Sequence, residues 1–183
     1  SQSGEPADTI GAVKEVQVKG GRVMGVVNVV GSSLARLCGH GAYIHSGPEM
    51  AVASTKAFSN MVATLFLFAL QIGRTRALSV HRGREIAEQL QLVPDLVERY
   101  LADPGPIDQV VEAVKDSQLV LFLGRGLSAA VAAEGALKLM EVAYIPCIAY
   151  PAGEMKHGPI ALLEKGSPVI VIAPRDVHRD KTL

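Results

Sequence analysis

Tryptophan is absent from this sequence, cysteine occurs twice, and aromatic residues make up only 4% of it. The sequence also has no excess of charge of either sign, because 18 basic and 18 acidic side chains cancel. A neutral chain lacks the basic surface of a nucleic-acid-binding protein, and a hydrophobic content of 49% is too high for a disordered one. Cys38 and Cys147 are too few and too far apart for a disulfide framework or a metal knuckle. We therefore expect a soluble, cytoplasmic α/β protein with two reduced thiols and no nucleic-acid partner.

Long hydrophobic runs are missing too. The longest apolar run covers residues 61–72, well short of the roughly 20 residues needed to cross a bilayer. We expect this run to form a buried core helix or an oligomer interface, and no membrane span.

Alternating strand and helix patterns are what the sequence does contain. Strands are expected at residues 22–30, 42–44, 118–123, 146–150 and 167–173, several of them continuous Val/Ile/Leu runs typical of parallel strands covered on both faces. Helices are expected at residues 6–19, 54–73 and 128–143, with a helix-rich stretch at about 85–115. This alternation predicts a three-layer αβα, doubly wound sheet that is mostly parallel.

Two related halves, each cut short, are expected on either side of a helical linker. Residues 75–116 are polar, charged and interrupted by prolines, which separates a first domain at 1–74 from a second at 117–183. A weak internal repeat supports the relation, because residues 47–50 (Gly-Pro-Glu-Met) resemble residues 152–155 (Ala-Gly-Glu-Met). The sequence starts without methionine and ends where a helix is beginning, so we interpret it as a piece of a longer protein, or as one whose numbering restarts.

The first five residues, Ser-Gln-Ser-Gly-Glu, precede a helix whose first turn holds Pro6, a residue well suited to that position. The hydroxyls of Ser1 and Ser3, with the free N–H groups of a helix start, would bind a phosphate. The alternative is an ordinary helix N-cap, which is the more common meaning of this pattern.

A second glycine-rich turn, Gly124-Arg125-Gly126, follows a predicted strand and precedes a helix. It could begin a dinucleotide-binding fingerprint. No strand ending in an acidic residue follows about 20 residues later, so the ribose ligand is missing. We therefore expect the turn to bring the backbone close to another ligand.

Glu134, Lys138 and Glu141 are spaced i, i+4 and i+7, so they share one face of the helix expected at 128–143. One interpretation is a solvated stripe whose Glu-Lys pair contributes only about 0.3–0.5 kcal/mol. The other is a cleft, favoured by the small residues on the rest of this helix. A lysine between two carboxylates can hold one of them ionised for proton abstraction.

The loop around His157 places a histidine between glycines and beside Lys156 and Glu154. Histidine titrates nearest neutral pH, which suits an acid or base, although a lone loop histidine is more often incidental. His40 and His45 lack metal-ligand spacing, and no chemistry is assigned to them.

Five segments in series resemble the isomerase half of the glutamine-fructose-6-phosphate aminotransferases, the glucosamine-6-phosphate synthase family. These are residues 1–5 (Ser-Gln-Ser-Gly-Glu), 52–58 (Val-Ala-Ser-Thr-Lys-Ala-Phe), 121–126 (Leu-Phe-Leu-Gly-Arg-Gly), 134–141 (Glu-Gly-Ala-Leu-Lys-Leu-Met-Glu) and 152–159 (Ala-Gly-Glu-Met-Lys-His-Gly-Pro). The match covers essentially the whole chain in order and spacing. It implies a pair of flavodoxin-like sugar isomerase (SIS) domains.

The resemblance also implies an activity. Such enzymes convert fructose 6-phosphate, with ammonia from a separate glutaminase domain, into glucosamine 6-phosphate for amino-sugar supply, and they need no metal or nucleotide cofactor.

Roles for individual residues follow from the same resemblance. It implies that Ser1, Gln2 and Ser3 grip the phosphate and that Val52 and Ser54 line the sugar site. It implies that Glu141 moves a proton between C1 and C2, that Lys138 assists it, and that Glu134 lies alongside. His157 would serve in ring opening and reach a neighbouring subunit's site, which implies a homodimer.

The sequence departs from the family pattern at Pro6, where a hydroxyl residue often adds a phosphate contact. The family's strand before the Ser-Gln-Ser loop, its C-terminal imine-forming lysine and its glutaminase domain lie outside this sequence, so we expect the isolated chain not to make glucosamine 6-phosphate. Two alternatives remain: a noncatalytic SIS module that binds a phosphosugar as a regulatory signal, and a phosphosugar isomerase that never uses ammonia.

Overall fold

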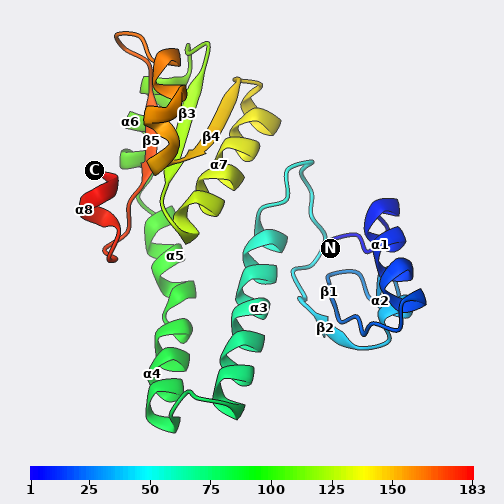
Figure 1. The fold of residues 1–183 in the computed structure, drawn as a ribbon. Coiled ribbons are helices and arrows are strands. Elements are labelled where there is room, and N and C mark those ends of the chain that lie inside the picture. Colours follow the sequence, from blue (N-terminus) through cyan, green and yellow to red (C-terminus); the bar gives the residue numbers. More distant parts are fainter. The chain divides into compact units, whose positions relative to one another are not determined.

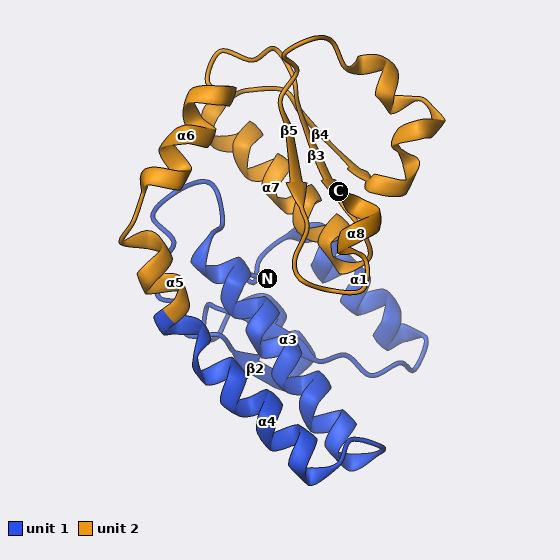
Figure 2. Cartoon of the chain, turned by 90° about the vertical axis from the view of Figure 1, so that its left-hand side faces the viewer, with its two compact units in different colours: residues 1–95 blue, residues 96–183 orange.

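The computed structural model describes all of residues 1–183. The chain divides into two compact units, residues 1–95 and 96–183 (Figure 2). Each unit has its own parallel sheet and its own hydrophobic core.

The first unit is built on a short parallel pair, β1 (Gly25–Val27) and β2 (Gly41–Tyr43), with Gly25 opposite Gly41. Helices α1 (Ala7–Val18) and α2 (Ser33–Cys38) cover one face. The core consists of Val13, Val27, Leu34 and Cys38. Gly41 permits the close strand pairing, because a Cβ there would lie 1.8 Å from the carbonyl oxygen of Gly25.

Helix α3 (Lys56–Thr75) follows β2 and turns back as α4 (Val80–Gln91), so that the two form a helical hairpin (Figure 1). Of the two alternatives expected for residues 61–72, the buried core helix was wrong for this chain, because Ala57 is the one buried residue of α3. The oligomer interface stays a prediction. The helix also extends past the apolar run at both ends. By length and composition alone, Lys56–Arg74 would suffice to cross a membrane, which is weak evidence by itself.

The second unit contains a three-stranded parallel sheet in the order β4-β3-β5 (Figure 1). Helix α5 (Val93–Leu101) crosses from the first unit into it, and α6 (Gly105–Val114) follows. The remaining elements are β3 (Val120–Gly124), α7 (Leu127–Ala143), β4 (Cys147–Pro151), the 3-10 helices η1 (Ala152–His157) and η2 (Pro159–Leu162), β5 (Val169–Ile172) and α8 (Arg179–Thr182).

Both faces of the second sheet are covered, because the chain crosses over on opposite sides. Between β3 and β4 it passes through α7, whose Ala132 and Ala136 pack on Phe122. Between β4 and β5 it passes through η1 and η2, where Met155 packs on Leu121 and the rest of the other face. Reversal of the crossover side at the central strand is the doubly wound arrangement. β3 is buried along its whole length, as its continuous apolar run predicts.

Each predicted strand overlaps an observed one, with ends that differ by a few residues, and both sheets are parallel as expected. The predicted helices are confirmed at α1, α3 and α7, and α4 to α6 occupy the helix-rich stretch. The short α2 was not predicted, and the segment expected as a loop around His157 folds as η1.

Candidate functional site

The Ser-Gln-Ser segment lies beside the carboxyl end of β1. The N–H of Asn28 donates to the carbonyl of Ser1 (3.1 Å), and the N–H of Val29 donates to that of Gln2 (3.3 Å). The carboxyl ends of parallel strands are where open α/β sheets bind their ligands. The segment expected to hold a phosphate is therefore at the ligand-binding edge of its sheet.

The segment is folded into a tight turn by its own hydroxyls. Ser1 Oγ accepts from the N–H of Gly4 (3.1 Å), and Ser3 Oγ accepts from that of Glu5 (3.2 Å). The Glu5 carboxylate in turn accepts from the N–H of Ser33 (2.8 Å), and this bond holds the pKa of Glu5 below its ordinary value. Both serine oxygens keep their hydroxyl hydrogens free to donate to a ligand.

A cavity of about 570 Å³ opens at this edge of the first unit. It is lined by Gln2, Asn28, Val29, His45, Gly47, Pro48 and Glu49. Of the five residues expected to bind the phosphosugar, Gln2 alone borders it. The cavity therefore adds residues, chiefly His45 and Glu49, that the sequence did not single out.

Asn28 ties the ends of β1 and β2 together beneath this cavity. Its Nδ2 donates to the carbonyl of Gly47 (2.7 Å), and its Oδ1 accepts from the N–H of Ser46 (2.8 Å). The hydroxyl of Ser46 accepts from Asn60 of α3 (2.8 Å). The residues after β2 are thus held in place by side chains, not only by the sheet.

The other two expected sugar-site residues lie just before α3. Val52 is 97% exposed. Ser54 Oγ is buried and has no hydrogen-bond partner, which is uncommon for a buried hydroxyl. Nearby, the Glu49 carboxylate accepts from the N–H of Ala57 (3.2 Å) and the hydroxyl of Thr55 (3.3 Å), so it caps the positive end of α3.

In the second unit, α7 brings together the three predicted acid-base residues. Lys138 Nζ lies 2.5 Å from Glu141 Oε2 and 3.7 Å from Glu134 Oε1. Their side chains are 23–31% exposed, far less than the exposed pair Glu112–Lys115 of α6. These three side chains are thus partly shielded from water, and within the set two carboxylates surround one ammonium.

The hydrogen bond from Lys138 to Glu141 raises the pKa of Lys138, and partial desolvation opposes this rise. Lys138 therefore remains a cation at neutral pH. A fixed cation against a carboxylate is an arrangement that can place a base and stabilise negative charge developing on a substrate oxygen.

His157 ends η1 and is exposed, without a hydrogen bond or ion pair to the α7 carboxylates. The same turn passes close to Arg125, whose Nη1 lies 3.4 Å from where a Cβ on Gly153 would be. Arg125 Nη2 also donates to the carbonyl of Lys181 (3.3 Å), while its buried Nε has no partner.

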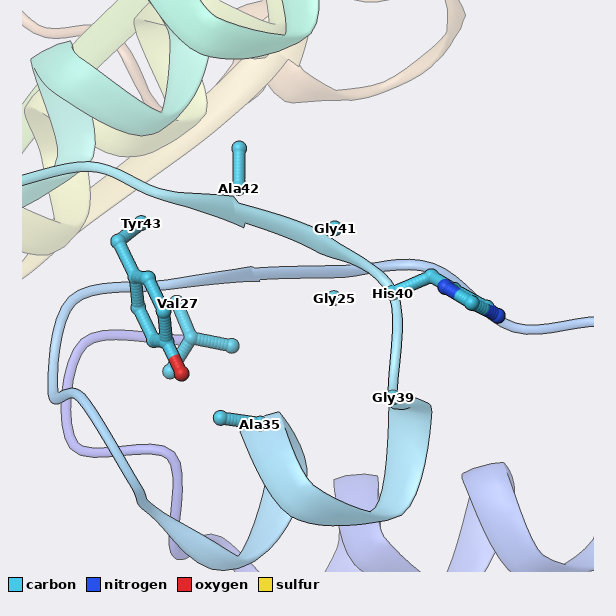
Figure 3. A pocket seen from close by; sticks show the side chains of 8 residues that line it. All are labelled: Gly25, Val27, Ala35, Gly39, His40, Gly41, Ala42 and Tyr43. Atoms are coloured by element: carbon cyan, nitrogen blue, oxygen red, sulfur yellow. The ribbon is translucent and has the colours of Figure 1, made fainter.

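A smaller cavity of about 140 Å³ lies beside β1, β2 and α2 (Figure 3). Glycines, alanines, Val27 and Tyr43 make up most of its lining, and the His40 side chain points away from the others. No predicted site residue borders this cavity. The structure also contains no group of three or more His, Cys, Asp or Glu side chains arranged to hold a metal ion.

The functional candidates missed from the sequence are Asn28, His45 and Glu49. One signal was available, because residues 47–50 repeat the motif of residues 152–155 and so mark a comparable strand end. Only the tertiary structure shows that His45 lines a cavity and that Asn28 is bonded to the next residue, Ser46.

Comparison with known proteins agrees with this architecture. A glutamine-fructose-6-phosphate aminotransferase (isomerizing) of Chlorobaculum tepidum is 48% identical over 96% of this chain, and one of Thermus thermophilus is 45% identical over all of it. The chain spans 29% and 30% of those proteins' lengths. The C-terminal domain of the glucosamine-fructose-6-phosphate aminotransferase from Francisella tularensis superposes with a TM-score of 0.96 at 40% identity, covering all of this chain and 52% of that one.

The model of the SIS domain family matches residues 1–71 and again residues 114–183. The first match includes most of α3, so that apolar helix is an element of the fold shared with the relatives. Together the two matches cover both sheets and all of the candidate site residues. The chain therefore belongs to the SIS domain family.

Proposed function

We propose that this chain is the isomerase part of a glutamine-fructose-6-phosphate aminotransferase, which forms glucosamine 6-phosphate from fructose 6-phosphate and ammonia. The observation that carries the proposal is the partly shielded set of Glu134, Lys138 and Glu141 on α7. A protein that only binds a phosphosugar has no need of a cation held between two carboxylates. The names of the relatives support the same activity.

The chemistry requires one proton to move between adjacent carbons. Ammonia replaces the C2 carbonyl oxygen of the open-chain ketose, forming a C2 imine and releasing water. A base then removes a proton from C1 while the imine nitrogen takes one up, which gives an enolamine. The base returns a proton to C2 while the C1 hydroxyl releases its own, which gives the aldose amine. Glu141 is the base we assign, because its carboxylate is partly shielded and lies against a cation.

Lys138 stabilises the negative charge that develops on the C1 oxygen, since it remains protonated. Glu134, 3.7 Å from the same ammonium, helps to orient it. The Ser1–Ser3 segment and its neighbouring cavity hold the phosphosugar, with Ser54 offering an unpaired hydroxyl and Val52 an apolar contact. His157, exposed on η1, assists ring opening.

The remaining parts of the proposal rest on the relatives' names and on the resemblance. The full-length protein contains a glutaminase domain that supplies ammonia, and it acts in the cytoplasm as a homodimer in amino-sugar synthesis leading to UDP-N-acetylglucosamine. The dimer brings His157 to a neighbouring subunit's site. The exposed apolar face of α3 is a surface that such an assembly would cover.

Binding is tested by calorimetric titration of the chain with glucosamine 6-phosphate, with inorganic phosphate and unphosphorylated glucosamine as controls. We expect saturable binding that requires both the sugar and the phosphate. Proton transfer is tested by incubating the chain with fructose 6-phosphate in D₂O and following C1 deuteration by NMR.

Glu141→Gln should abolish C1 deuteration and preserve binding. The matched control is Glu112→Gln, which breaks a lysine pair of the same i, i+3 spacing on an exposed helix face. Full exchange in Glu141→Gln would remove Glu141 from the mechanism.

A further inference from the structure

The cavity beside the Ser-Gln-Ser segment has an unusual balance of charge for a phosphosugar site. Among its lining residues, Glu49 carries a negative charge and His45 is the one side chain that can carry a positive charge. Pro6 offers no hydroxyl at the start of α1. A phosphate dianion at this edge therefore has His45 as its one source of cationic side-chain contact within the cavity.

The backbone around His45 is fixed on both sides. Ile44 is buried, and its N–H donates to the carbonyl of Val27 (3.0 Å). Ser46 is bonded to the side chain of Asn28 (2.8 Å). His45 itself adopts φ of 50°, in the left-handed region that non-glycine residues seldom occupy. A conformation of this kind persists only where the surroundings enforce it, and it often marks a functional position.

The imidazole is left available for a ligand. Its ring lies near the ring of Tyr43, at a centroid distance of 6.2 Å and an interplanar angle of 60°. It makes no hydrogen bond or ion pair within the chain. Glu49, the nearest acidic side chain of the cavity lining, has its carboxylate engaged by the start of α3 and so does not pair with it.

We propose that His45 binds the anionic group of the phosphosugar in this cavity. This role rests on the proposed function, and it adds a residue outside the Ser1–Ser3 segment. Gln2 borders the cavity from the Ser1–Ser3 segment, and His45 borders it from the end of β2. A protonated imidazole donating to a phosphate oxygen makes a charge-assisted hydrogen bond, which is stronger than a neutral one.

The sign of the pH dependence follows from the charge. An imidazolium attracts a phosphate and a neutral imidazole does not, and histidine as a residue type changes charge between about pH 5 and 8, so a histidine contact with phosphate is expected to be stronger near pH 6 than near pH 8.5. The other titratable side chains near His45 are Glu49, which lines the same cavity, and Tyr43, whose ring contacts the imidazole. The ligand's own phosphate also titrates near pH 6, but it does so equally for every variant.

The experiment is calorimetric titration of glucosamine 6-phosphate into the unaltered chain, His45→Asn and His40→Asn, at about pH 6 and pH 8.5. Asparagine tolerates the left-handed backbone, so the fold should be retained, as a thermal melt would verify. His40→Asn removes the same charge from a histidine that does not line this cavity. We expect His45→Asn to bind roughly tenfold more weakly at pH 6 and nearly normally at pH 8.5, and His40→Asn to match the unaltered chain.

Equal affinities of His45→Asn and the unaltered chain at both pH values would overturn this inference and leave the proposed function standing. A loss of the same size at both pH values, or one shared by His40→Asn, would overturn it as well. Absence of saturable binding by the unaltered chain would overturn both proposals together.

Discussion

At the residue scale, the contact between Lys138 and Glu141 is the one whose chemistry is most open to direct measurement. Glu141 is the nearer carboxylate, at 2.5 Å against 3.7 Å for Glu134, and it is the main cause of the raised pKa of Lys138. We predict that Glu141→Gln lowers the pKa of Lys138 more than Glu134→Gln does. Titration of the lysine ε-carbon by NMR measures both, and a larger drop in Glu134→Gln would contradict the geometry.

The raised pKa of Lys138 also makes the stability of the fold depend on pH. Because the pKa of Lys138 is raised in the folded chain, the pair stabilises the fold below the unfolded-state pKa of lysine. That contribution is lost as the pH rises through the folded value, so the difference in melting temperature between the unaltered chain and Glu141→Gln should shrink in strongly alkaline buffer.

Sequence spacing was enough to predict that Glu134, Lys138 and Glu141 share a face, because helix geometry is local. It could not predict which carboxylate lies nearer the ammonium, since i+3 and i−4 neighbours are equally possible partners. It also missed His45, because the position of that side chain depends on a hydrogen-bonded tie from Asn28, 17 positions earlier in the printed sequence.

At the scale of elements, the turn from β3 into α7 is the most tightly constrained connection in the second unit. A Cβ on Gly124 would lie 2.1 Å from the carbonyl oxygen of Ser128, so backbone would have to shift. We predict that Gly124→Ala destabilises the chain by about 3 kcal/mol or more. Gly11→Ala, inside α1 with nothing within 4 Å, should instead stabilise it by up to about 1 kcal/mol.

Urea unfolding of the two glycine variants measures this contrast. A Gly124→Ala chain as stable as the unaltered one would show that the turn has more room than the structure gives it.

Strands were predictable because continuous apolar runs of four or five residues are distinctive, as in β3 and β5. Short helices were not predictable in this way. Helix α2 has six residues and is stabilised by packing of Leu34 and Cys38 on β1, not by a periodic pattern of its own. For α3 the helix was predictable, but its exposure was not, because hydropathy says that a surface is apolar and does not say what covers it.

At the scale of the whole molecule, the two units should respond separately to damage in their cores. Leu121 is 1% exposed in the second unit, and Leu121→Ala should cost about 2–5 kcal/mol. We predict faster amide hydrogen exchange in β3, β4 and β5, with exchange in α1 and β1 unchanged. Val27→Ala, in the core of the first unit, should give the reverse pattern. Uniform acceleration in either variant would mean that the chain unfolds as one cooperative body.

The two cysteines provide an independent measure of the same behaviour. Cys38 is buried in the core of the first unit and Cys147 in that of the second, and burial raises the pKa of the Cys147 thiol. Neither thiol can react with an alkylating reagent until its own unit opens. The unmodified protein thus contains one cysteine in each unit whose alkylation rate reports the opening of that unit. Mass spectrometry of the alkylated peptides would give both opening rates in one experiment.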